Sequence, residues 1–109
     1  MVRLTVTLNA GSARRVQGLL DAFRFLITST RLEPGCESCS AWADSDATVH
    51  YVEEWSSEAD LRRRVRSPGF TSLLNIMESA EEAPRVQFDF VTQSRGLDYV
   101  AEVRREFVP

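Results

Sequence analysis

The sequence has few of the residues that metal and acid-base chemistry use most. It holds two cysteines, Cys36 and Cys39, one histidine, His50, and no lysine, so all thirteen basic residues are arginine. A structural zinc site needs four ligands, which one histidine and one Cys-x-x-Cys pair cannot supply. No glycine-rich phosphate loop and no nucleophile-elbow serine motif occurs. The sequence therefore predicts no metal and none of the familiar nucleotide-binding or hydrolase sites.

Charge and hydropathy exclude two further kinds of partner. The net charge is −3, so the chain lacks the positive field that attracts a phosphate backbone, and we expect no nucleic-acid partner. No segment approaches the roughly 20 apolar residues of a membrane span, and the N-terminal VRLTVTL alternates polar and apolar residues, unlike a signal peptide. We expect a soluble, cytoplasmic protein without a membrane partner.

Hydrophobic periodicity predicts six successive elements. Alternation predicts strands, helical spacing predicts helices, and Pro34-Gly35 and Ser67-Pro68-Gly69 predict breaks. Ser12 and the Ser57…Asp60 pair are candidate helix caps. The elements are a strand at 2–8, a helix to about Thr30, a hairpin of strands at 37–43 and 48–55, a helix broken at Pro68 and ending near Glu81, and a strand at 85–93.

This order is that of the α+β, ferredoxin-like βαββαβ fold, a four-stranded antiparallel sheet with helices on one face. At 109 residues the chain forms one core, which we place in residues 1–94. The other face of the sheet needs a cover, and sheets of this kind commonly pair in a dimer. Residues 95–109 read as a C-terminal tail in which Val100, Val103 and Phe107 have helical spacing, and we expect it to dock on its own body or on a partner subunit.

The stretch EPGCESC raises the question of whether its cysteines act in chemistry. Their two-residue gap is that of a zinc half-site or of a redox pair. A redox pair normally starts a helix, which lowers the thiol pKa, whereas this pair enters a strand. We favour two small, half-buried strand residues over a functional site.

The remaining candidates are one histidine and the aromatic residues. Any acid-base role rests on His50 alone, although a strand histidine packed beside aromatic side chains is usually structural. Ten aromatics are many for so small a domain, and most belong in a core. A sheet that is covered incompletely by helices still leaves room for an apolar pocket that would suit a flat organic ligand.

The segments EPGCESCSAWAD, TVHYVEEWSSEADL and RSPGF, in this order, resemble the antibiotic biosynthesis monooxygenase (ABM) family, which includes quinol monooxygenases. The similarity covers about residues 2–92. It implies a dimeric α+β barrel of ferredoxin-like type, and it implies that EPGC is a turn without metal or redox use. Enzymes of this family oxidise aromatic polyketides or hydroquinones with molecular oxygen and without flavin, metal or haem. The resemblance thus implies a cofactor-independent monooxygenase acting as a homodimer on a small hydrophobic aromatic ligand.

The chain departs from the family where histidines are common, since those positions hold Arg64 and Gly69. We therefore predict His50 as the base and Arg64, which stays protonated, as the group that stabilises an anionic intermediate. The predicted substrate-binding residues are Asn9, Trp55, Tyr51 and Phe70. Two alternatives stay open: a non-catalytic dimeric module that binds or senses a small hydrophobic ligand, and a structural dimer fastened by the tail. The sequence does not identify the substrate.

Overall fold

The computed structural model describes residues 1–44, 47–80 and 82–106, and its elements follow the predicted order. They are β1 (Val2–Asn9), α1 (Ala13–Thr30), β2 (Cys36–Ala43), β3 (Thr48–Trp55), α2 (Glu58–Val65), α3 (Pro68–Glu78), β4 (Arg85–Phe90) and α4 (Leu97–Arg105).

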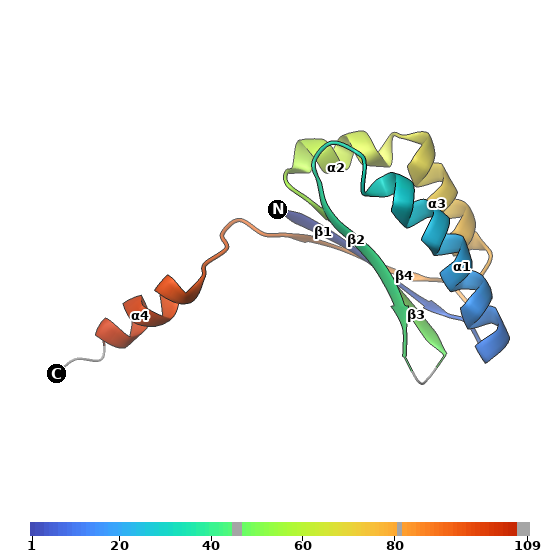
Figure 1. The fold of residues 1–109 in the computed structure, drawn as a ribbon, viewed down its shortest axis with the longest axis horizontal. Helices are drawn as coiled ribbons and strands as arrows, with labels where there is room; N and C mark the ends of the chain where they lie inside the picture. The colour runs from blue at the N-terminus through green and yellow to red at the C-terminus, as the bar shows by residue number, and fades with distance from the viewer. Residues whose placement is uncertain (45–46, 81, 107–109) are drawn as a thin grey trace.

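The four strands form one antiparallel sheet in the order β2-β3-β1-β4, and α1, α2 and α3 cover one of its faces (Figure 1). This confirms the ferredoxin-like α+β fold. The central strands β1 and β3 alternate between the two faces, so one row of each strand meets the helices and the other row faces outward.

The core lies between the sheet and α1. Val2, Leu4, Val6 and Leu8 of β1 are all buried, as their alternation predicts. The ring of Phe23 from α1 stacks on Tyr51 of β3 with ring centroids 4.8 Å apart. Each such apolar side chain stabilises the fold by about 1.5–3 kcal/mol when fully buried.

The helices begin where the sequence predicts caps. The Ser12 hydroxyl accepts a hydrogen bond from Arg15 N, and Ser57 Oγ accepts one from Asp60 N at 3.2 Å while donating to Asp60 Oδ2 at 2.9 Å. Pro68 opens α3 at its first position, so the predicted break between α2 and α3 is also confirmed.

Two boundaries differ from expectation by more than one residue. Helix α3 ends at Glu78, before Glu81, which lies outside the described residues. Strand β4 ends at Phe90 instead of near residue 93, because its partner β1 begins at Val2 and Val91 can pair only with Met1, whose oxygen accepts from Val91 N at 2.8 Å.

The tail beyond β4 forms α4, which projects away from the sheet and helices (Figure 1). The radius of gyration is 17.2 Å and the longest axis 58 Å, whereas a compact chain of this length would have a radius of about 13 Å. No helix among the described residues is long and apolar enough to span a membrane.

Candidate functional site

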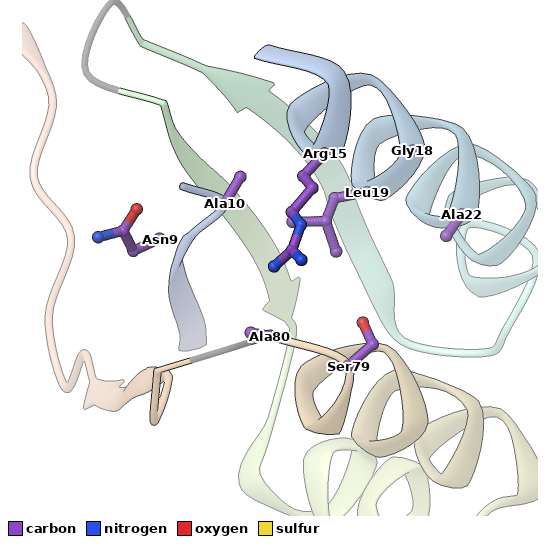
Figure 2. A pocket seen from close by; sticks show the side chains of 8 residues that line it. All are labelled: Asn9, Ala10, Arg15, Gly18, Leu19, Ala22, Ser79 and Ala80. Atoms are coloured by element: carbon purple, nitrogen blue, oxygen red, sulfur yellow. The ribbon is translucent and has the colours of Figure 1, made fainter. Parts of the chain in front are cut away.

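A hollow of about 420 Å³ opens between α1 and the end of α3, beside the end of β1 (Figure 2). Five of its eight lining residues are glycine, alanine or serine, and these small side chains leave the gap between the two helices. The lining is Asn9, Ala10, Arg15, Gly18, Leu19, Ala22, Ser79 and Ala80. Gly18, Leu19 and Ala22 of α1 form an apolar wall, and the polar residues of the lining are Asn9, Arg15 and Ser79.

The polar groups of the hollow come from three elements. Arg15 extends from the first turn of α1 into the space between Ala10 and Ser79 (Figure 2). Asn9 ends β1 at the rim, where its amide oxygen accepts from Gly11 N at 3.0 Å and its Nδ2 donates to Glu82 Oε2 at 3.3 Å. The Arg15 guanidinium thus reaches into the hollow, whereas the Asn9 amide is held at the rim by Gly11 and Glu82.

A second cluster of polar side chains lies inside the core and is centred on Glu53. This side chain is completely buried in the row of β3 that faces the helices. It accepts hydrogen bonds from Tyr51 Oη at 2.5 Å and from Trp55 Nε1 at 2.9 Å. Arg64 Nη2 donates to it at 2.9 Å. Glu53 thus ties two aromatic side chains of its own strand to α2.

Arg64 is held from three directions. Besides Glu53, its Nη1 donates to Glu33 Oε2 at 2.8 Å, and its Nη2 donates to Thr30 Oγ1 at 2.9 Å. Burial opposes its charge, but the hydrogen bonds and the negative charge of Glu53 outweigh that effect and raise the pKa of Arg64 above its usual value. The guanidinium is a permanent cation that joins the end of α1, α2 and β3.

Both cysteines face the helices, because the register of β2 shifts between Cys36 and Ser38 and pairs Cys36 with Trp55 and Cys39 with Glu53. Both are free thiols. Burial raises the pKa of Cys39 to about 12, although its hydrogen bond with Tyr51 acts in the opposite direction. Burial also raises the pKa of Cys36. A thiolate, which a redox or metal-binding cysteine needs, is disfavoured at both positions.

No group of three or more histidine, cysteine, aspartate or glutamate side chains within residues 1–44, 47–80 and 82–106 is arranged to hold a metal ion.

His50 lies on the opposite face of the sheet, which none of the helices in the described part of the chain covers. Its ring stacks on Trp42 at a centroid distance of 5.3 Å, and its Nε2 lies 3.0 Å from Asp44 Oδ2. In the antiparallel register of β3 and β1, His50 lies opposite Thr7 of β1. Arg64 of α2 is buried on the helix side of the sheet, where it contacts Glu53, so the sheet separates the two residues predicted to be catalytic.

The predicted residues therefore occupy four places. Asn9 lines the hollow, Tyr51, Trp55 and Arg64 belong to the buried cluster around Glu53, and His50 faces outward. Phe70 lies near the start of α3 and packs against the core.

Sequence reasoning did not identify Glu53, Arg15 or Gly18. For Glu53 a signal existed, because an acid in the same row as Val49, Tyr51 and Trp55 must find a buried partner. For Arg15 and Gly18 no signal existed, since their importance depends on how α1 and α3 pack.

The fold and the hollow define a ferredoxin-like α+β domain with a ligand-sized space between its helices. Residues 1–74 match the antibiotic biosynthesis monooxygenase family, and the chain belongs to that family. The family is one of monooxygenases. No curated protein matches the chain significantly.

Solved structures share the fold at low sequence identity. One of an antibiotic biosynthesis monooxygenase is 20% identical, with a TM-score of 0.69, and the match covers 85% of this chain and 100% of that one. A protein from Deinococcus radiodurans is 19% identical, with a TM-score of 0.75 and coverage of 88% and 97%. A variant of SnoaB, a cofactor-independent oxygenase from Streptomyces nogalater, is 14% identical, with a TM-score of 0.70 and coverage of 85% and 94%.

Proposed function

We propose that this protein is a cofactor-independent monooxygenase that oxidises a quinol or polyketide-like aromatic with molecular oxygen, and that the hollow between α1 and α3 holds the substrate. The observation that carries the proposal is a hollow of about 420 Å³ with an apolar wall and a polar rim, in a chain of a monooxygenase family. Pockets for small organic ligands occupy about 300–1,000 Å³.

The reaction can proceed without a cofactor because the substrate supplies the electrons. In an anthrone-like substrate two C–H bonds at the oxidised carbon are replaced by C=O, one oxygen atom enters the product, and the other leaves as water. The four electrons come from the substrate, so no external reductant is needed. The protein has to bind the ionised substrate, exclude bulk water and stabilise negative charge.

The donors that line the hollow are the Arg15 guanidinium, which extends into it, and the Asn9 amide at its rim. An Arg64 that moved to a substrate would leave Glu53 buried without its charge partner, which is unfavourable. For His50, the role of base is a separate proposal that requires a substrate on the uncovered face of the sheet.

Gly18 offers a direct test. A Cβ atom added at Gly18 would meet no atom within 4 Å, so Gly18→Leu is expected to place its side chain in the hollow that Gly18 lines, while Gly18→Ala adds one methyl group as the matched control. With metal-stripped protein and a panel of hydroquinones and anthrones, we expect oxygen uptake above autoxidation. We expect Gly18→Leu to lower kcat/KM about tenfold or more, and Gly18→Ala to lower it little.

The outcomes separate the possibilities. If Gly18→Leu turns over substrate as the wild type does, the hollow is not the substrate site. If His50→Ala abolishes turnover while Gly18→Leu has no effect, the uncovered face carries the reaction.

A second candidate is a non-catalytic module that binds a small hydrophobic ligand. It is favoured by the absence of a histidine from the lining of the hollow and by the engagement of Arg64 with Glu33 and Glu53. Saturable binding of a hydroquinone, abolished by Gly18→Leu and without oxygen uptake, would support this module against the enzyme.

A further inference from the structure

Helix α4 exposes an apolar stripe. Leu97 is 83% exposed and Val100 48% exposed, and with Val103 they recur every third residue along one side of the helix. Tyr99 adds a half-exposed ring beside them. An isolated helix of nine residues is marginal in water, because helices of this length depend on packing for their stability. Packing of this apolar stripe against another surface would therefore stabilise α4.

A groove of matching character lies between α2 and the edge strand β4. Phe88 and Phe90 pair with Leu4 and Val2, which puts their rings on the helix side of the sheet, yet they are 39% and 55% exposed because α2 and α3 do not reach the edge. Leu61 and Val65 of α2 form the opposite wall, and the space measures about 550 Å³. The rim carries Glu58, Arg62 and Arg66.

The helix and the groove match in length and in charge. Helix α2 has eight residues and α4 nine, which is about 12–14 Å for each. Helix α2 starts with Glu58, carries Arg62 in its middle and is followed by Arg66. Helix α4 has Asp98 in its first turn and Glu102 past its middle, and it ends with Arg104 and Arg105. An antiparallel arrangement would bring unlike charges together along the whole contact.

The two acidic residues of α4 are only partly neutralised by their local partner, so negative charge remains for a contact with α2. Within the segment that follows β4, which we call the arm (residues 91–106), Arg95 pairs with both Asp98 and Glu102. One guanidinium thus faces two carboxylates. On α2, the contact between Arg62 and Glu58 is long, at 3.9 Å, and exposed. These local pairs are weak and can exchange for pairs across an interface.

The path of the chain points away from its own groove. Val91 N donates to Met1 O at 2.8 Å, and the N-terminus of Met1 donates back to Val91 O at 3.3 Å, so the chain leaves the body in the direction of β4. Figure 1 shows the segment after β4 running outward to α4.

We propose that α4 docks in the α2/β4 groove of a second copy of this chain, antiparallel to α2, and that the second copy returns the same contact. A twofold axis would make the exchange reciprocal and would double the area buried. Each arm would cover the exposed phenylalanines of the other copy, and the partner would close the edge strand that the monomer leaves uncovered.

Charge reversal tests the pairing in the full-length chain. Arg62 and Glu102 would lie opposite each other in the antiparallel arrangement and both are exposed, so Arg62→Glu and Glu102→Arg should leave the fold intact, which circular dichroism checks. By light scattering across a dilution series, we expect each single variant to dissociate at a concentration several-fold higher than the wild type. The double variant should recover much of the loss. Reversal at Glu37, which is exposed on β2 outside the groove, is the matched control and should change nothing.

A crosslink distinguishes the second copy from the chain's own groove. One chain carries Val65→Cys and a separately tagged chain carries Val100→Cys, and the two are mixed under oxidising conditions. We expect a covalent heterodimer. A monomer by light scattering, or a double variant that closes within one chain while the mixture stays uncrosslinked, would overturn the proposal. Because the groove and the hollow share no lining residue, these results are independent of oxygen uptake.

Discussion

Gly69 makes room for Arg64. A Cβ atom at position 69 would lie 2.4 Å from Arg64 Nη1, which is closer than real contacts of this kind. The two departures noticed in the sequence, at positions 64 and 69, therefore belong to one arrangement. A long buried cation at position 64 requires the absence of a side chain at position 69.

Gly69→Ala should destabilise the protein although alanine is the better helix former. The added methyl group pushes Nη1 away from Glu33, and we expect a loss of about 1–3 kcal/mol in the free energy of unfolding in urea. Gly18→Ala is the control, since it meets no neighbouring atom and should stabilise α1 by up to about 1 kcal/mol. Equal effects at the two glycines would contradict this interpretation.

Arg64→Met should cost about 3–5 kcal/mol, because it leaves the Glu53 carboxylate buried without its charge partner. Arg62→Met is the control on the same helix, where the side chain is 70% exposed and the expected change is within about 0.5 kcal/mol. Combining Arg64→Met with Glu53→Gln should restore part of the loss, since the amide oxygen still accepts from Trp55. Strict additivity of the two single changes would show that the residues are not coupled.

Stability should fall as the pH rises from about 9 towards 12. Burial raises the pKa of Cys39 from its usual 9.0 to about 12, and burial together with the Glu53 charge raises the pKa of Tyr51. The folded state thus keeps protons that the unfolded chain releases, so its advantage is complete below pH 9 and is lost at higher pH. Urea unfolding at several pH values measures the slope. Cys39→Ala should flatten it, whereas Tyr99→Phe on exposed α4 should not.

Gly35→Ala should destabilise the turn of the EPGC segment for two separable reasons. Gly35 has a φ of +84°, and a Cβ there would lie 2.3 Å from Cγ of Asp60, which Ser56, Ser57 and Arg63 hold in place. We expect a loss of 1 kcal/mol or more, on the order of other substitutions at positive φ. In an Asp60→Ala background the clash disappears, so Gly35→Ala should cost less there. An unchanged cost would assign the whole effect to the backbone.

The sequence by itself determined the secondary structure and the fold class. Period-two alternation from Val2 to Leu8 left only one face able to enter the core, and Ser12, Ser57 and Pro68 specified the helix starts through local hydrogen bonds and a fixed φ. Such features act over a few residues, so they can be interpreted without knowing what packs against them.

Only the tertiary structure decided where the chemistry can lie. The register shift between Cys36 and Ser38 turns both thiols to one face, and the sheet separates His50 from Arg64. Arg64 points inward because it pairs with Glu33 and Glu53, which come from other parts of the chain, and because Gly69 has no side chain to block it. The hollow exists because small residues of α1 meet small residues at the end of α3. These outcomes depend on how distant surfaces pack, and residue spacing along the chain does not encode that packing locally.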